Sequence, residues 1–455
     1  MASRKTTRPR KSAPALDSSS HVSSTTEEMM LAALARGDDT FHTGRFVATF
    51  KDGAVDAGSK SMASAHGMHV ADARDYDHQA ITLDNVAGAD AVVFPEIGVA
   101  LIGGAAAQER GITAAAEIST DSAMASIDPE YFVFHLGATD AFFRSLGTGT
   151  SNPGDYLRGF LRAAETIARD LGGAGATIAA SDHEQQALAL GATWGLVACK
   201  VPPSTRSGAG IKVAVLDTGL DLGHPDFAGR AITSATFVGQ PVQDLHSHGT
   251  HCIGTSCGPQ APAGSTPRYG IAYRVAIFAG KVMSNSGSSV GGSVLAGMNW
   301  AIANGCQVIS MSLGSQSSVQ PYYTAAGQSA LNKGLLMVAA AGNAAGPTGA
   351  PANSPTILSV AALDTNLTPA SFSDFGKVEI SGPGLNIFSS VPRPTLYGYK
   401  SGTSMATPHV AGCAALWAET SATLRGMALW NKLRQTAKSL PFPPARVGSG
   451  LVQAP

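Results

Sequence analysis

Residues 402–409 read Gly-Thr-Ser-Met-Ala-Thr-Pro-His, and an apolar run over residues 410–416 follows at once. The change from small polar residues to an apolar run predicts a loop that delivers the hydroxyl of Ser404 to the start of a helix. The first N–H groups of a helix have no intrahelical partners, and the helix dipole is positive at that end. Gly402 has no side chain to obstruct a bound chain, and Pro408 falls in the first turn, where proline costs no helical hydrogen bond. The segment therefore predicts a hydroxyl beside a site for a developing negative charge.

A serine hydroxyl is a weak nucleophile at neutral pH, so it needs a base and a group that orients the base. Two upstream segments can supply them. Residues 211–219, Ile-Lys-Val-Ala-Val-Leu-Asp-Thr-Gly, predict a buried strand with Asp217 at its carboxyl end, where ligands gather in parallel sheets. Residues 244–251, Asp-Leu-His-Ser-His-Gly-Thr-His, place His248 at the start of another helix of small residues. The three segments together indicate nucleophilic catalysis.

The three segments resemble those of the subtilisin-like serine proteases (subtilases), in the chain order Asp, His, Ser, and the similarity runs from about residue 193 to near the C-terminus. The resemblance implies that Ser404 attacks the scissile carbonyl. His248 would take the proton and hand it to the leaving amine, and Asp217 would orient the imidazole. Asn343, which follows the apolar residues 335–338, resembles the family's side-chain donor to the oxyanion.

Other segments resemble the family's substrate-binding edges. Ser312, Leu313 and Gly314 match one edge, and Gly287 and Ser288 match the opposite one. A peptide between these edges would be held by strand addition, which reads mainly backbone.

Gly349 resembles the glycine that keeps the main specificity pocket of the family open. Because no charged residue adjoins these pocket positions, we expect a neutral, apolar or aromatic side chain on the acyl side of the cut.

The histidines also allow a metal site. His248 and His251 are three residues apart on one helical face, but the glutamate of an H-E-x-x-H zinc motif is missing, so we expect no catalytic metal. His251 is predicted to be a packed, hydrogen-bonded neighbour. Asp244 and His246 are predicted to be solvated loop residues, with a substrate subsite as the alternative.

Asp226 matches a position that ligates calcium in some subtilases. The segment that would supply the other ligands, residues 258–264, departs from the family pattern. The resemblance implies no cofactor for the chemistry, and it leaves a structural calcium ion open.

The composition is that of a large globular chain. Of 455 residues, 44% are hydrophobic and only 14% are charged, so the chain can bury a large core. The net charge of −1 argues against nucleic acid as the main partner, and the sequence contains no apolar stretch long enough for a membrane span. The expected partner is a protein or peptide substrate.

The five cysteines cannot all pair within one chain, and their spacing is unlike that of a zinc site. We predict reduced thiols and synthesis in a reducing compartment. A cysteine nucleophile in place of Ser404 is the rival interpretation, but none of the five lies where a family motif would put one. They are Cys199, Cys252, Cys257, Cys306 and Cys413.

Residues 1–40 are predicted to be a disordered basic tail rich in serine and threonine. No apolar core follows the basic residues, so a secretory signal peptide is not expected. The sequence predicts a cytoplasmic location at synthesis and leaves leaderless export open. A tether to nucleic acid or a membrane surface is the alternative role for the tail.

Residues 41–137 predict a small ferredoxin-like α+β domain with the order β-α-β-β-α-β. The unit resembles the family's inhibitory propeptide, which would make the chain a zymogen with its own N-terminal domain as intramolecular inhibitor. An unrelated accessory domain is the alternative. The expected strands are 45–50, 91–94, 97–102 and 131–134, and the expected helices are 55–66 and 105–117.

Residues 138–192 predict a helical connector, with an amphipathic pattern over 153–171 and a flexible glycine-rich stretch over 172–176. If the chain cuts itself, we expect the cut between Gly172 and Thr193.

Residues 193–455 alternate predicted strands with helices, which argues for a doubly wound, mostly parallel sheet of the α/β class. The expected function is a serine endopeptidase made as a self-inhibited precursor. Two alternatives stay open: a catalytically idle subtilase fold that acts by binding, and a metallopeptidase that uses His248 and His251.

Overall fold

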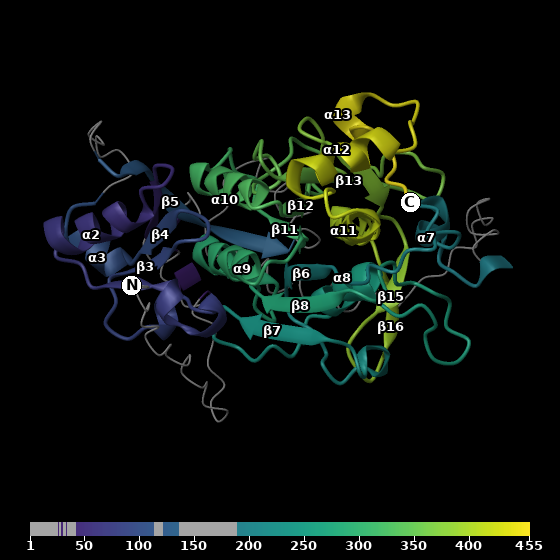
Figure 1. Ribbon diagram of the computed structural model, residues 1–455, viewed down its shortest axis with the longest axis horizontal. Helices are drawn as coiled ribbons and strands as arrows, with labels where there is room; N and C mark the ends of the chain where they lie inside the picture. Colours follow the sequence, from purple (N-terminus) through teal and green to yellow (C-terminus); the bar gives the residue numbers. More distant parts are fainter. Residues whose placement is uncertain (1–25, 27–28, 31–32, 34–41, 113–121, 136–188) are drawn as a thin grey trace, which may run out of the picture.

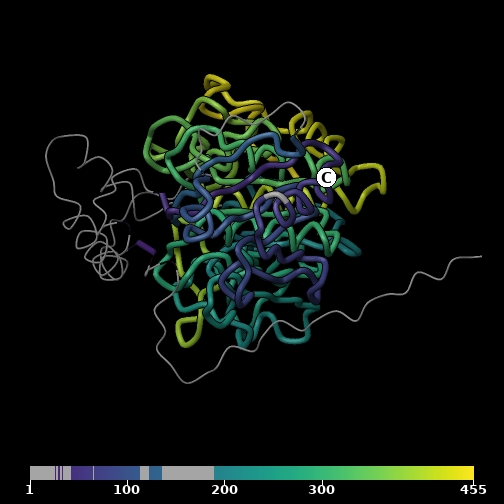
Figure 2. The backbone as a smooth tube through the Cα atoms, turned by 90° about the vertical axis from the view of Figure 1, so that its left-hand side faces the viewer, coloured from purple at the N-terminus to yellow at the C-terminus, as the bar shows by residue number. Residues whose placement is uncertain are grey.

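The computed structural model describes residues 26, 29–30, 33, 42–112, 122–135 and 189–455. These residues form a catalytic unit around a central sheet and a smaller N-terminal unit beside it (Figure 1). Seen from the side of the N-terminal unit, that unit lies over one side of the catalytic unit (Figure 2). Most of the predicted tail, most of the predicted connector and residues 172–188 of the expected processing region lie outside the described residues. The four tail residues that are described, Thr26, Met29, Met30 and Ala33, are helical, in contrast to the predicted disorder.

The central sheet has seven strands in the order β14-β13-β12-β10-β6-β8-β7, and every neighbouring pair is parallel. Most of its residues are buried, as expected for a parallel sheet covered on both faces. The predicted doubly wound α/β fold is confirmed. The strands are β6 (Lys212–Asp217), β7 (Ile232–Thr236), β8 (Ala276–Lys281), β10 (Val308–Met311), β12 (Leu336–Ala340), β13 (Leu358–Leu363) and β14 (Ile380–Pro383).

Helices cover both faces of this sheet, and β6 shows why. Val213 and Val215 belong to one hydrophobic core, whereas Ala214 and Leu216 belong to another. Successive side chains of a strand point to opposite faces, so each face needs its own cover. One core includes residues of α8 (His248–Cys257), α11 (Thr403–Thr420) and α12 (Gly426–Thr436), and the other includes residues of α9 (Gly291–Ala303) and α10 (Pro321–Asn332).

The N-terminal unit contains a sheet with the order β5-β1-β4-β3-β2, in which only the β2–β3 pair is parallel. The expected helix over 55–66 is present. The expected helix over 105–117 is shorter: α3 ends at Glu109, a turn with Gly111 at a φ of 61° follows, and residues 113–121 lie outside the described residues. The elements are β1 (His42–Phe50), α2 (Val55–Ala65), β2 (Val70–Asp72), β3 (Ala91–Phe94), β4 (Val99–Ile102), α3 (Gly104–Glu109) and β5 (Met124–His135). The ferredoxin-like assignment of this unit stays a prediction.

Strand β5 joins the two units. The sequence predicted it only over residues 131–134, but it has twelve residues and extends from the N-terminal sheet to the catalytic unit (Figure 1). Its far end pairs antiparallel with β9 (Ser288–Val290) and with β11 (Leu313–Gly314). One continuous strand therefore belongs to the N-terminal unit at one end and to the catalytic unit at the other.

Smaller elements complete the catalytic unit. They are α7 (Trp194–Ala198), α13 (Pro444–Val447) and the antiparallel hairpin β15 (Ile387–Ser390) and β16 (Tyr397–Lys400). Within the described ranges, no helix combines the length and the apolar character needed to cross a membrane.

Candidate active site

Asp217 and His248 form a buried hydrogen-bonded pair. Asp217 is the last residue of β6, His248 is the first of α8, and each side chain is only 1% exposed. The His248 Nδ1 lies 2.7 Å from Asp217 Oδ1, which also accepts the backbone N–H of Thr218 at 2.8 Å. When Asp217 is ionised its carboxylate can only accept, so Nδ1 of His248 then carries the proton and Nε2 is left as an acceptor.

Burial controls the charge of this pair. It raises the pKa of Asp217 to about 7, although the hydrogen bond from Thr218 opposes that shift. Burial, followed by the positive charges of His246 and Lys400, lowers the pKa of His248 well below 6.5. The imidazole is therefore neutral at neutral pH, which is the form that can accept a proton.

Asp244 holds the loop before His248 in place. It is fully buried, so the prediction that it is a solvated loop residue is wrong. Its Oδ1 accepts the backbone N–H groups of His246 and Ser247, both at 2.9 Å, and its Oδ2 accepts that of Thr250 at 2.8 Å. Ser247 has a left-handed backbone with φ of 77°, which these hydrogen bonds help to maintain. Asp244 thereby positions the start of α8.

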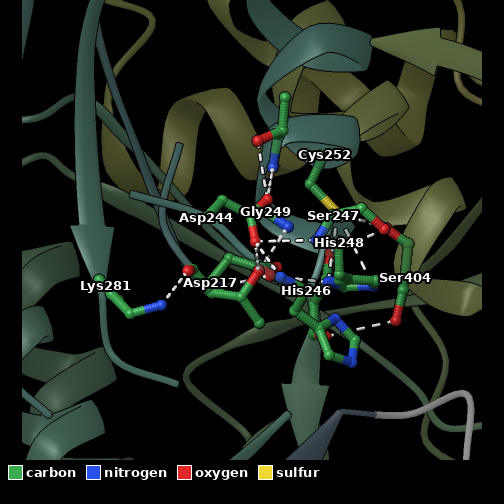
Figure 3. A network of polar contacts seen from close by, with 12 residues as sticks. Asp217, Asp244, His246, Ser247, His248, Gly249, Cys252, Lys281 and Ser404 are labelled. Atoms are coloured by element: carbon green, nitrogen blue, oxygen red, sulfur yellow. Dashed lines mark hydrogen bonds and ion pairs between the residues drawn. The ribbon is translucent and has the colours of Figure 1, made fainter. Parts of the chain in front are cut away.

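Ser404 is the second residue of α11 and is buried beside the pair (Figure 3). Its Oγ donates to the carbonyl oxygen of Ser312 at 3.3 Å, and Ser312 Oγ donates to the carbonyl of Ser404 at 2.8 Å. Figure 3 shows His248 between Asp217 and Ser404. The serine hydroxyl is thus hydrogen-bonded to the edge segment, and no bond between it and the imidazole is recorded among the described residues.

Cys252 lies under the imidazole, a proximity that sequence reasoning missed. Its Sγ is 3.9 Å from both ring nitrogens of His248 and donates to the carbonyl of Ser404 at 3.5 Å. Cys252 follows His248 by one helical turn, a spacing that could have revealed the contact. Burial raises the pKa of the thiol well above 9, so it stays protonated and is a poor nucleophile.

The ligand atoms of Asp217, His248 and Cys252 lie within 4.8 Å of one another, the one group of this kind among the described residues that could hold a metal ion. His251 is not part of it. Its Nε2 is hydrogen-bonded to the carbonyl of Ile387 at 2.8 Å and the residue is fully buried. The histidine pair that would make a metallopeptidase therefore has one member turned to the backbone of β15.

Asn343 is oriented by Thr403. The amide oxygen of Asn343 accepts both the backbone N–H and the hydroxyl of Thr403 at 2.8 Å. This leaves Nδ2 as the end of the amide that can donate. Gly402 lies beside that donor, since a Cβ placed on Gly402 would be 3.2 Å from Nδ2, and its φ of 152° also favours glycine. The arrangement directs a side-chain donor toward the start of α11, near Ser404.

The predicted substrate edges flank an extended chain, and that chain is β5. Phe134 is in register with Ser288 on one side and with Gly314 on the other, and His135 is in register with Leu313. The backbone N–H of His135 donates to the carbonyl of Gly287 at 2.9 Å. The segments that the sequence singled out thus form two edges of one groove.

Gly349 has a packing role. A Cβ at this position would lie 2.2 Å from the carbonyl oxygen of Ser315, so no larger residue fits without moving the backbone. Its neighbour Ala350 exchanges two backbone hydrogen bonds with Ser315, at 2.8 and 2.9 Å.

His135 brings a third imidazole to the site. Its ring centroid lies 3.8 Å from that of His248 and 5.1 Å from that of His246 (the rings of His246 and His248 are labelled in Figure 3). His246 is half-buried rather than solvated, and its Nδ1 has no hydrogen-bond partner among the described residues. The alternative prediction for His246, a position lining the substrate groove, fits this placement better.

Asp226 has partners of its own outside the Asp217–His248 pair. Asp226 Oδ2 accepts the hydroxyls of Tyr269 at 2.5 Å and Tyr397 at 3.0 Å, so it is engaged with two aromatic side chains. It belongs to no group of potential metal ligands among the described residues. All five cysteines are free and buried, as predicted for reduced thiols.

The fold and the groove together define a peptidase of the α/β class. The chain matches the family model described as "Subtilase family" over residues 208–450, and it therefore belongs to the subtilase family. It is 40% identical over 280 residues to an alkaline protease of Alkalihalobacillus alcalophilus, a match that covers 60% of this chain and 71% of the relative. It is 41% identical over 268 residues to subtilisin Savinase of Lederbergia lenta, covering 57% and 96%.

A solved structure supports the same family assignment. The crystal structure of a cold-adapted subtilisin-like serine proteinase matches with a TM-score of 0.51 at 30% identity, over 58% of this chain and 99% of that one. The chain is thus a subtilisin-like serine protease, an enzyme as predicted from its sequence.

Proposed function

We propose that the chain cleaves peptide bonds through Ser404, His248 and Asp217, and that its N-terminal unit keeps it inactive until the chain is cut. The observation that carries the first part is the buried hydrogen bond between His248 and Asp217 beside a serine at a helix start. The observation that carries the second part is β5, which fills the groove between β9 and β11.

In the proposed reaction, Ser404 Oγ leaves its hydrogen bond to Ser312 and transfers its proton to Nε2 of His248 as it attacks the scissile carbonyl. Asp217 keeps the Nδ1 proton in place and stabilises the imidazolium that forms. The backbone N–H of Ser404 and Nδ2 of Asn343 stabilise the negative oxygen of the intermediate. Each step uses side chains and backbone of this chain, and subtilases need no cofactor for the chemistry.

The N-terminal unit would inhibit the enzyme because β5 occupies the groove between β9 and β11. Backbone groups that would bind a substrate are already paired with β5 on both edges, and His135 covers the ring of His248. A second chain cannot form the same ladder while β5 is in place.

Two further contacts anchor β5. Glu130 is fully buried, and it accepts the Thr43 hydroxyl and the backbone N–H of Gly292, each at 2.5 Å. Gly292 is in the first turn of α9, where an acidic group is favoured by the helix dipole. Phe132 and Phe134 pack in one buried cluster with Val290, Met30 and Ala33.

The alternative is a catalytically idle fold that acts by binding. A fluorophosphonate, which reacts only with an activated serine, separates the two. We expect the full-length chain to be labelled slowly at first and faster after incubation, as cutting removes β5 from the groove. The Ser404→Ala chain should not be labelled, and Ser265→Ala, which changes an exposed serine, should be labelled like wild type. A wild-type chain that takes no label even after the N-terminal unit has been cut off contradicts the proposal.

A further inference from the structure

Asp374 is a fully buried acidic residue in the segment between β13 and β14, and the proposed reaction does not use it. Resting on the proposed function, in which Asn343 donates to the oxyanion, we propose that Asp374 is a positioning residue for this donor. It acts on the backbone that carries Asn343 and on one edge of the groove.

The carboxylate of Asp374 holds the loop that follows Asn343. Its Oδ1 accepts the backbone N–H groups of Ala344 at 2.8 Å and Gly346 at 2.9 Å. Ala345, between these two donors, has a left-handed backbone with φ of 51°, which is unfavourable for a residue with a side chain. Such a conformation persists only when its surroundings hold it, and the two hydrogen bonds to Asp374 are part of that support.

Asp374 also holds the residue that precedes Asn343. The backbone N–H of Asp374 donates to the carbonyl oxygen of Gly342 at 2.9 Å. The carboxylate packs directly against Gly342, because a Cβ placed on this glycine would clash with Oδ2 of Asp374. One residue therefore contacts the backbone on both sides of the proposed oxyanion donor.

Thr403 and Asp374 have separate roles toward Asn343. The amide oxygen of Asn343 accepts both the N–H and the hydroxyl of Thr403, and Thr403 Oγ1 accepts the N–H of Gly342 at 3.2 Å. Thr403 thus determines which end of the amide is free to donate. Asp374 determines where the backbone that carries the amide lies. Without Asp374, Asn343 could still donate, but from a displaced position.

A third hydrogen bond connects Asp374 to the substrate edge. Gln316 Nε2 donates to Asp374 Oδ2 at 2.7 Å. Gln316 follows Ser315, which pairs with Ala350 and comes directly after β11, the edge that pairs with β5. The same carboxylate therefore joins the loop of the oxyanion donor to the segment that would hold the substrate. This connection favours catalysis because the donor must lie about 2.7–3.1 Å from the oxyanion of a substrate placed by that edge.

Loss of Asp374 should lower kcat more than it raises KM. The hydrogen bond to the oxyanion forms only as the carbonyl is attacked, whereas a bound substrate keeps its backbone pairing with the edges. A misplacement of about 1 Å can cost about 10²-fold in rate. Asp374→Ala should therefore lower kcat at least about tenfold and leave KM within about threefold of wild type.

Asp374→Asn should restore kcat to within about threefold of wild type. Its amide oxygen can accept both backbone N–H groups, and Gln316 can turn its own amide to accept from the new Nδ2. A role limited to general stability of the fold would not produce this pattern of loss in kcat and rescue by asparagine.

The test is a double-mutant cycle of Asp374→Ala with Asn343→Ala, measured as kcat and KM on a peptide p-nitroanilide with leucine on the acyl side. Each full-length variant is first treated with a trace of tagged wild-type enzyme, so that slow variants are also cut, and the tagged enzyme is then removed. Asn343→Ala alone should lower kcat about 10²-fold or more, the loss typical of one missing oxyanion donor. In that background Asp374→Ala should lower kcat by less than about twofold further, because the donor through which it acts is gone.

Asp364→Ala is the matched control. Asp364 Oδ1 also accepts two backbone N–H groups, from Asn366 and Thr368, each at 2.9 Å, in the turn that follows β13. Its removal should leave kcat and KM within about twofold of wild type, even if the thermal midpoint falls.

The outcomes separate this inference from the proposed function. Equal losses from Asp374→Ala with and without Asn343 overturn the inference, and so does a wild-type kcat in Asp374→Ala beside a slow Asn343→Ala. If Asp374→Ala does not fold, Asp374→Ser takes its place under the same criteria, because its short hydroxyl can replace only part of the hydrogen bonds. An Asn343→Ala chain as fast as wild type overturns the oxyanion role in the proposed function. A wild-type chain without activity or fluorophosphonate label overturns the proposed function as a whole.

Discussion

The imidazole of His135, from β5, packs edge-on against the imidazole of His248, with ring planes inclined by 76°. Burial lowers the pKa of His135 well below 6.5, and the positive charges of His248, His246 and Lys400 act in the same direction. This contact makes the pairing of β5 with β9 and β11, here called the seating of β5, depend on pH.

Acid should loosen β5 through His135. Because the pKa of His135 is lower in the seated state than in a free strand, seating is favoured fully above about pH 6.5 and is weakened as the pH falls below that value. Hydrogen exchange of β5 amides in the Ser404→Ala chain, corrected for intrinsic rates, measures this without cleavage. His135→Gln should show a smaller loss of protection between pH 7.5 and 5.5 than the same chain with His135, and an equal loss contradicts the prediction.

Glu130 should give the seating of β5 a pH dependence opposite to that from His135. Burial raises its pKa above 4.5, although Arg45 and the hydrogen bonds from Thr43 and Gly292 oppose the shift. The stabilisation of the seated strand that comes from this raised pKa is therefore full below about pH 4.5, and it is lost as the pH rises through the raised pKa. Glu130→Gln should remove this dependence. Glu130→Ala should weaken seating at all pH values by about 1–3 kcal/mol, because a buried N–H loses its acceptor. Hydrogen exchange of β5 in the Ser404→Ala background reports both effects.

Cadmium should inhibit the enzyme through Cys252. A thiophilic cation can replace the thiol proton, and the ligand atoms of Asp217, His248 and Cys252 lie within 4.8 Å of one another. We expect Cd²⁺ to abolish activity in wild type and to have little effect on Cys252→Ala. Without cadmium, the activity of Cys252→Ala should stay within about tenfold of wild type, because the thiol takes no part in the proposed steps and its removal leaves only a small cavity. The control variant Cys306→Ala, which changes another buried thiol, should stay sensitive to cadmium. Equal inhibition of wild type, Cys252→Ala and Cys306→Ala by cadmium contradicts the prediction.

Lys400 should help to set the acid limit of activity. Its positive charge is one of the causes, after burial and His246, that lower the pKa of His248. Replacing it with glutamine should shift the acid limb of the kcat/KM profile upward by about 0.3–0.5 pH unit, the size expected for one screened charge. Lys438→Gln, at an exposed lysine, is the matched control. A profile that does not move in Lys400→Gln would show that the charge is screened from the imidazole.

The ion pair of Asp221 and Arg393 should contribute to stability in an acid-sensitive way. Burial of Asp221 favours its neutral form, but the side-chain and backbone hydrogen bonds from Arg393 outweigh it and hold the pKa of Asp221 below 3.8. The stabilisation is present above pH 3.8 and is lost as the pH falls toward the lowered pKa. Arg393→Gln should lower the thermal midpoint at pH 6, and the difference from wild type should shrink by pH 3. A constant difference would locate the effect in packing instead.

The central sheet and the site segments were predictable because local signals agreed there. The run before Asp217 is apolar and bounded by glycine, and the small-residue helices begin at His248 and next to Ser404. Each signal lies within about ten residues, so no tertiary contact was needed to read it.

The features that sequence reasoning missed depend on contacts between distant segments. Asp244 is polar and lies in a loop, so nothing local shows that it is buried and accepts the hydroxyl of Thr218, 26 residues earlier, at 3.0 Å. The early start of β5 at Met124 depends on pairing with β1, and the hairpin of β15 and β16 depends on packing against α8. Tertiary context overrides local propensity in these places.

Because β5 and the two edges that hold it belong to one polypeptide, the strand reaches its place between β9 and β11 without diffusion. The local concentration of this tethered strand is set by the fold and not by the amount of protein in solution. Pairing of β5 with these edges in the uncut chain should therefore not change on dilution, whereas binding of a separately added N-terminal unit should weaken as the proteins are diluted.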